Sequence, residues 1–108
     1  MTEQANAAAQ LTPSALAGVR VVEMGQLIAG PFCGKTLGDF GAEIIKIEAT
    51  GTGDPLRNWR LLKNGTSVWW QVQSRNKKSV ALDLRQQEAQ DIARKLIAEA
   101  DVLIENFR

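Results

Sequence analysis

The 108-residue sequence contains no histidine and only one cysteine, Cys33. Without histidine, the chain cannot form the Ser–His or Cys–His pairs that activate a nucleophile, and most zinc sites are excluded. A single cysteine cannot form an internal disulfide, which is typical of a reducing compartment, so we expect a cytoplasmic location and no metal site. Any catalysis would therefore depend on carboxylates, lysines or backbone donors.

Long apolar runs are also missing. No stretch approaches the ~18 consecutive apolar residues that a membrane-spanning helix needs, so we expect no membrane partner. The first residues, MTEQANAAAQLTPS, have neither the basic nor the apolar region of a secretory signal. We therefore interpret residues 1–15 as a flexible leader and residues 16–108 as the folded part of the chain.

Positive charge is present in excess in one stretch, between Asp54 and Asp83. This stretch has no acidic residue and contains Arg57, Arg60, Lys63, Arg75, Lys77 and Lys78. Such a run of like charges indicates either an anionic partner or a solvated surface, on which folding reduces the repulsion between the charges.

Runs rich in β-branched residues predict four buried strands. They are VRVVEMG (19–25), AEIIKIEA (42–49), KSVALDL (78–84) and DVLIENF (101–107). Pro31 suits the first turn of a helix and Gly41 suits its end, which predicts a helix between the first two strands. Alanines at helical spacing predict a second helix over residues 86–100.

The rest of the chain is less regular. GTGDP (51–55) has the composition of a turn, and SVWWQVQS (67–74) fits either a helix or an extended segment. Its adjacent tryptophans, Trp69 and Trp70, indicate core packing or a lid. Strands that alternate with helices predict an α/β fold, a Rossmann-like parallel sheet with flanking helices. Ligands of such sheets lie outside the carboxyl ends of the strands, which are here GQLIAGP, EATGTGD, LDLR and ENFR.

The segment AGPFCGKT (29–36) loosely matches the phosphate-binding P-loop. Ala29 replaces the first glycine, however, and Pro31 removes one N–H from the loop that would surround the phosphate. The match to a P-loop is therefore weak, and a P-loop is kept here only as the alternative interpretation. Three glycines at a spacing of four residues predict instead a smooth helix face that packs closely on the sheet or on a ligand: Gly30, Gly34 and Gly38.

Five segments together carry a family resemblance: AGP, LGDFGAEIIKIE, GTGD, NKKSVALDL and DVLIENF. Each is weak alone, but their order and spacing are specific. Through them residues 16–108 resemble the class III CoA-transferases, the group of formyl-CoA transferase and carnitine CoA-transferase. The resemblance implies coenzyme A (CoA) or an acyl-CoA as substrate, a carboxylic acid as second substrate and no tightly bound cofactor. An α-methylacyl-CoA racemase, or a stand-alone nucleotide- or CoA-binding module, is the alternative.

The resemblance also implies which residues contact CoA. The family positions fall on Ile28, Ala29, Ala49, Leu82, Asp83, Leu84, Arg85, Asn106 and Phe107. Some members carry glutamine at the place of Ile28, near the reacting groups, whereas the glutamine here is Gln26. Some members carry arginine at the place of Ala49, where it contacts the nucleotide end of CoA. Part of the contact with CoA therefore differs in this chain.

Arg85 has the side chain best suited to the phosphates of CoA, because a planar guanidinium binds two oxygens at once. Arg75, Lys77 and Lys78 are expected to cluster with it around one strand. A surface ion pair is the alternative role for Arg85. For Asp83 the alternative is to cap the helix that follows.

Members of the family use an aspartate carboxylate as nucleophile, which splits acyl transfer into easier covalent steps. In the family this aspartate lies well beyond the ENFR segment, so we assign no catalytic residue here. We expect residues 16–108 to form the N-terminal, CoA-binding part of a larger domain, inactive alone. The resemblance further implies an interlocked homodimer for the whole protein, and we expect no nucleic-acid partner.

Overall fold

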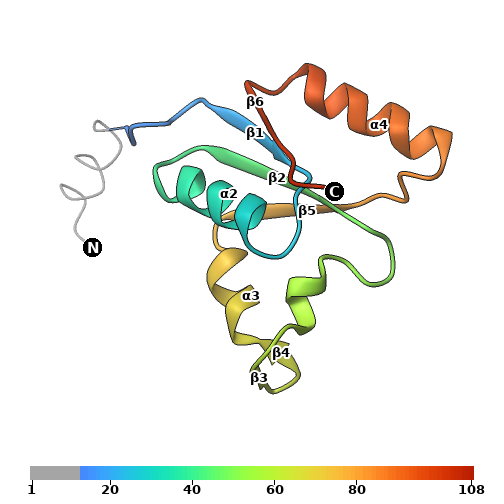
Figure 1. The fold of residues 1–108 in the computed structure, drawn as a ribbon. Coiled ribbons are helices and arrows are strands. Elements are labelled where there is room, and N and C mark those ends of the chain that lie inside the picture. Colours follow the sequence, from blue (N-terminus) through green and yellow to red (C-terminus); the bar gives the residue numbers. More distant parts are fainter. Residues whose placement is uncertain (1–12) are drawn as a thin grey trace.

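A computed structural model describes residues 13–108 and contains a four-stranded parallel sheet (Figure 1). Most of the leader, residues 1–12, lies outside the described residues. The strand order is β5–β2–β1–β6, and all three pairings are parallel. The strands are β1 (Arg20–Glu23), β2 (Glu43–Glu48), β5 (Lys77–Ala81) and β6 (Val102–Ile104). The predicted α/β fold with a parallel sheet is therefore confirmed.

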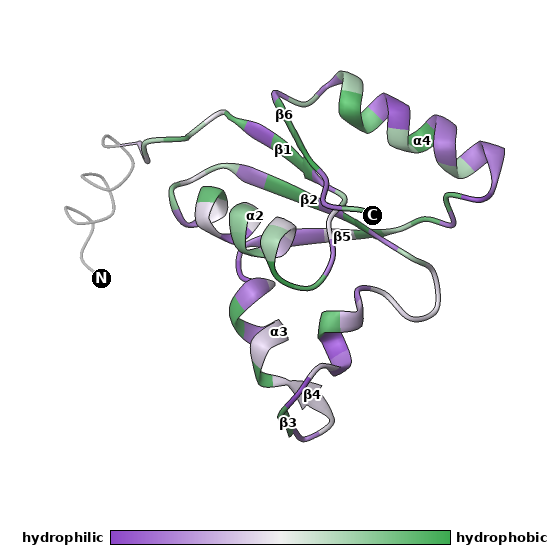
Figure 2. Ribbon diagram, in the orientation of Figure 1, coloured by the Kyte–Doolittle hydropathy of each residue, from purple (hydrophilic) through white to green (hydrophobic). Residues whose placement is uncertain are grey.

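The sheet has a separate apolar cluster on each face. Val21 packs with Ile44 and with Leu37 of helix α2 (Ala29–Asp39). Val22 packs with Ile47 and with residues of helix α4 (Gln87–Ala98), among them Ala93. Because successive side chains of a strand point to opposite faces, these clusters place α2 and α4 on opposite sides of the sheet. Figure 2 shows hydrophilic and apolar residues alternating along α4, as expected for a helix with one buried side.

The glycine face of α2 lies directly on the sheet. Gly34 and Gly38 are both buried, and a Cβ atom added to Gly38 would lie 3.1 Å from Cγ1 of Ile44. A Cβ atom on Gly34 would overlap the carboxylate of Glu23 on β1. The predicted close packing of this helix on the sheet is thus confirmed, and larger residues would push α2 away.

All four strands end earlier than predicted, and the difference is largest for β5 and β6. β5 ends at Ala81 instead of residue 84, because the chain turns there and the backbone N–H of Gln86 donates to the carbonyl of Asp83. β6 ends at Ile104 instead of residue 107, because the Asn106 side chain turns back to bond the loop after β1. In both cases the residues past the strand shape the edge of the sheet where ligands are expected.

The segment between β2 and β5 forms a small appendage beside the sheet (Figure 1). It consists of the 3₁₀ turn η1 (Pro55–Asn58), the antiparallel pair β3 (Leu62–Lys63) and β4 (Thr66–Ser67), and helix α3 (Val68–Gln73). Trp69 lies edge-on to Trp59, with ring centroids 5.8 Å apart, and is 41% exposed. The ambiguous tryptophan segment is therefore a helix, and Trp69 is a surface residue. None of the helices in the described part of the chain combines the length and apolar character needed to cross a membrane.

Candidate ligand-binding site

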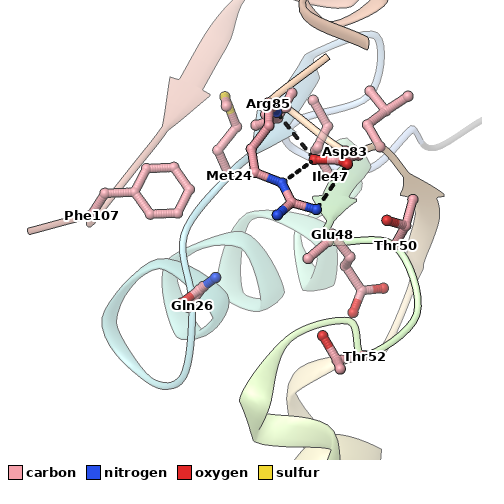
Figure 3. Close-up of a pocket in the computed structure, with 12 residues that line it drawn as sticks. Met24, Gln26, Ile47, Glu48, Thr50, Thr52, Asp83, Arg85 and Phe107 are labelled. Carbon is pink, nitrogen blue, oxygen red and sulfur yellow. Dashed lines mark hydrogen bonds and ion pairs between the residues drawn. The ribbon is translucent and has the colours of Figure 1, made fainter.

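A hollow of about 520 Å³ lies at the carboxyl ends of β1 and β2 and beside the loop after β5 (Figure 3). Seven of the ten residues expected near a ligand line it: Gln26, Ala49, Leu82, Asp83, Leu84, Arg85 and Phe107. Parallel strands bring these distant segments together because their carboxyl ends meet at one edge of the sheet. Figure 3 shows Arg85 and Asp83 facing Phe107 and Gln26 across this hollow.

A second hollow of about 510 Å³ adjoins the first. It is lined by the remaining three expected residues, Ile28, Ala29 and Asn106, and also by Gln26 and Phe107, which line the first hollow as well. Gln26 and Phe107 therefore mark the junction between the two. Because the hollows share these residues, a ligand longer than either hollow could extend across both, and we call the two hollows together the depression.

Arg85 and Asp83 form an ion pair at the first hollow. Nε and Nη2 of Arg85 donate to the two Asp83 oxygens at 2.9 and 3.0 Å (Figure 3). Hydrogen bonds from the Arg85 side chain and backbone lower the pKa of the Asp83 carboxyl, so it stays charged. The Arg85 side chain is 88% exposed, so its guanidinium can leave Asp83 for a bound anion. Asp83 does not cap α4, because Gln86 holds the N-cap position without a side-chain bond.

Glu48 is largely buried, lines the first hollow and fixes the loop after β2. Its carboxylate accepts two hydrogen bonds from Arg57, at 2.8 and 2.7 Å, and one from the Asp54 backbone N–H at 2.9 Å. Burial opposes ionisation of Glu48, but the hydrogen bonds from Arg57, Asp54 and Ser79 outweigh it and lower its pKa to about 2. The guanidinium of Arg57 is occupied by this contact and does not line the first hollow.

The Asn106 side chain forms two hydrogen bonds with the backbone of the loop between β1 and α2. The Gln26 backbone N–H donates to Asn106 Oδ1 at 2.8 Å, and Asn106 Nδ2 donates to the Gln26 carbonyl at 3.1 Å. Gly25 leaves room for the Asn106 amide, because a Cβ atom there would overlap Oδ1. These two bonds occupy Oδ1 and one amide hydrogen of Asn106. We infer that Asn106 shapes the depression mainly through the loop that it holds.

The other basic residues do not gather with Arg85. Lys77 and Lys78 pair with Ile44 and Ile45 in the parallel register, at the opposite end of β5 from the hollows. Lys78 Nζ lies 3.0 Å from the Glu43 carboxylate, and Lys77 is buried against Glu23. Burial lowers the pKa of Lys77, although its ion pair with Glu23 opposes this. The expected basic cluster is therefore dispersed, and Arg85 alone reaches the first hollow.

Sequence reasoning missed five lining residues of the first hollow. Met24 and Ile47 supply apolar surface, Thr50 and Thr52 supply hydroxyls, and Glu48 supplies a carboxylate. All five belong to the carboxyl ends of β1 and β2 or to the loop that follows β2, so the position rule for parallel sheets is the signal that could have found them.

Two further observations concern a nucleotide site and a metal site. The P-loop-like segment lies entirely within α2, and Lys35 Nζ is 2.9 Å from the Asp39 carboxylate. A phosphate-binding loop would have to precede the helix, so the segment does not form one. Within residues 13–108, no three cysteine, aspartate or glutamate side chains are grouped so that they could hold a metal ion.

Comparison with known proteins agrees with the geometry. Residues 16–108 match the family described as CoA-transferase family III. The chain is 50% identical over 100 residues to the succinyl-CoA–D-citramalate CoA-transferase of Chloroflexus aurantiacus, covering 92% of this chain and 25% of that protein. It is 40% identical over 93 residues to the succinyl-CoA:glutarate CoA-transferase of Homo sapiens, covering 85% of this chain and 21% of that protein.

A solved structure shows the same fold. The crystal structure of a CAIB/BAIF family protein from Brucella suis superimposes with a TM-score of 0.80 at 39% identity, over 89% of this chain and 26% of that one. The chain thus spans about a quarter of the length of the relatives that it matches.

Proposed function

Because the chain belongs to CoA-transferase family III, we propose that it forms the CoA-binding part of an acyl-CoA:carboxylate CoA-transferase. One observation carries this proposal. All ten residues that the family resemblance associates with CoA or the reacting groups border the two adjoining hollows. They come from four segments far apart in the sequence, so their convergence is a property of the fold.

The depression has the features that an elongated, phosphorylated thioester requires. Arg85 offers an exposed guanidinium for phosphate oxygens, and Met24, Ile47 and Leu82 offer apolar surface. Gln26 lies at the junction of the hollows, where it would be adjacent to the reacting groups. In this proposal CoA binds along the depression as substrate, and no other cofactor takes part.

The proposed acyl donor is a short dicarboxylyl-CoA such as succinyl-CoA, and the acceptor a small carboxylic acid. The similar proteins from Chloroflexus and from human carry succinyl-CoA and a small acid in their names. In this proposal a carboxylate outside residues 16–108 is the nucleophile, because the aspartate that the family resemblance implies lies beyond the ENFR segment. The chain alone is therefore expected to bind CoA without transferring it. The whole enzyme is proposed to be a cytoplasmic interlocked homodimer.

Isothermal titration of the chain with CoA tests this proposal. We expect saturable binding of CoA and succinyl-CoA, and much weaker binding of magnesium ATP, because the depression also contacts the pantetheine arm. Lys35→Ala serves as the control and should leave CoA binding unchanged, since Lys35 lines neither hollow. Binding of magnesium ATP that Lys35→Ala abolishes would contradict the proposal and favour a P-loop, and so would the absence of any CoA binding.

A further inference from the structure

Four charged side chains form a buried network beneath the β1–α2 loop. The side chains of Glu23, Lys46, Asp54 and Lys77 are each 3% exposed or less. Lys46 Nζ lies 2.6 Å from Glu23 Oε2 and 2.9 Å from Asp54 Oδ2, and Lys77 Nζ lies 2.6 Å from Glu23 Oε1. The two positive charges balance the two negative ones. None of the four lines either hollow, so the network does not serve as a direct ligand contact.

Stability alone is a weak reason for such a network. Removing charges from water is costly, and well-packed apolar residues of similar volume often give an equally stable core. The remaining hydrogen bonds of the network point to another role. Lys46 Nζ donates to the Gly25 carbonyl at 3.1 Å, and Lys77 Nζ donates to the Pro31 carbonyl at 2.8 Å. The network therefore holds the backbone on both sides of the β1–α2 loop.

The third backbone contact lies inside the loop. Asp54 Oδ1 accepts hydrogen bonds from the Leu27 N–H at 3.1 Å and from the Leu56 N–H at 2.9 Å. Leu27 has φ +62°, in the left-handed region that a leucine rarely adopts. Such a conformation persists only where the surrounding structure imposes it. Leu27 lies between Gln26 and Ile28, which both border the depression.

We propose that Asp54 is a positioning residue for the CoA site. Its carboxylate, held by Lys46, fixes the Leu27 amide and keeps the loop in the left-handed turn that presents Gln26 and Ile28 to the hollows. Asp54 itself does not contact the ligand. The inference rests on the proposed function, because it states how the CoA-binding loop is shaped.

Two variants and one control test the role of Asp54. Asp54→Ala removes the acceptor of the Leu27 amide. Asp54→Asn keeps an oxygen that can accept the same hydrogen bond, and so keeps the chain testable if the alanine variant does not fold. Glu43→Gln removes a carboxylate at the other end of the same strand, β2, away from both hollows.

The first measurement is hydrogen exchange of the Leu27 amide, which needs no ligand. We expect exchange at Leu27 to accelerate at least about tenfold in Asp54→Ala, beyond any change at β2 amides, since a lost hydrogen bond exposes the group. Asp54→Asn should restore most of the protection, and Glu43→Gln should match the unmodified chain. If Leu27 and β2 amides change equally in Asp54→Ala, or Leu27 does not change, the network is merely structural and the inference is overturned.

The second measurement is the CoA dissociation constant, taken well below the melting temperature of each variant. We expect Asp54→Ala to weaken CoA binding about tenfold, Asp54→Asn to recover most of this loss, and Glu43→Gln to have no effect. Faster exchange at Leu27 with unchanged CoA affinity would overturn the positioning role. Absence of CoA binding by the unmodified chain would instead contradict the proposed function, and Leu27 exchange would then decide by itself whether Asp54 holds the loop.

Discussion

At the scale of single residues, the Arg85 guanidinium is hydrogen-bonded to Asp83 and is still exposed enough to bind a phosphate. Its ion pair with Asp83 joins two residues of one exposed loop. Exposed pairs of this kind contribute little to stability, because water screens the charges and both side chains lose freedom. A phosphate carries more charge than the Asp83 carboxylate and is expected to compete for the guanidinium.

Arg85→Ala should weaken CoA binding roughly ten- to hundredfold, the usual loss when charge-assisted hydrogen bonds are removed. Arg94→Ala is the matched control, because Arg94 is also exposed and paired with an aspartate, Asp91, but belongs to α4 away from both hollows. Titration calorimetry at two salt concentrations measures both. Equal affinities for the two variants would show that Arg85 makes no phosphate contact.

Glu48 gives a prediction on pH. Its pKa is about 2 in the folded chain against an ordinary value of 4.5, so its contribution to stability is fully present above pH 4.5. That contribution is lost as the pH falls through 4.5 towards 2, because the unfolded chain takes up the proton first. Urea unfolding between pH 5 and about 2 should show a smaller loss of stability in Glu48→Gln than in the unmodified chain. If Glu48→Gln and the unmodified chain lose the same stability over this pH range, the hydrogen bonds assigned to the Glu48 carboxylate would be contradicted.

At the scale of elements, the contact of α2 with the sheet decides the shape of the loop before it. Gly34 lies against Glu23, which belongs to the buried charge network. A substitution that moves α2 therefore also disturbs the groups that hold the loop. Glycine is unfavourable in the middle of a helix, so its presence here reflects the close approach and not helix propensity.

Gly34→Ala should lower the free energy of unfolding by about 1–3 kcal/mol, the usual effect of overpacking, although alanine is the better helix former. Cys33→Ala, one residue earlier on the exposed side of the same helix, should change stability little. Chemical denaturation measures both variants. Stabilisation by Gly34→Ala would mean that α2 lies further from β1 than described.

The sequence predicted whole elements better than side-chain directions. β-branched runs located all four strands, and Pro31 and Gly41 bracketed α2, because these signals act locally. The basic cluster around Arg85 was not found, because a charge run does not reveal that Lys77 turns into the interior. Buried charges such as Lys46 are rare, and their partners are far apart in sequence, so no pattern predicted the network.

At the scale of the whole molecule, β6 is at one end of the strand order, and Val102 and Leu103 are 38% and 45% exposed. An edge strand with apolar side chains can pair with another chain. We expect the chain to self-associate as its concentration rises.

Val102→Lys should reduce this association, measured by sedimentation velocity, while exposed Ile92→Lys on α4 serves as the control. Monomers of 11.8 kDa at all concentrations would contradict the expectation.

The bridge between Asn106 and Gln26 has a consequence for the order of folding. Its two residues are 80 positions apart, so the β1–α2 loop cannot be held from that side until β6 has docked on β1. Closing a loop of this length costs entropy that only late, long-range contacts recover. During synthesis, β1, β2 and β5 would emerge and pair while the depression still lacks one wall. Ligand affinity would thus appear only once β6 and Asn106 are in place, and it would report the docking of β6 on β1.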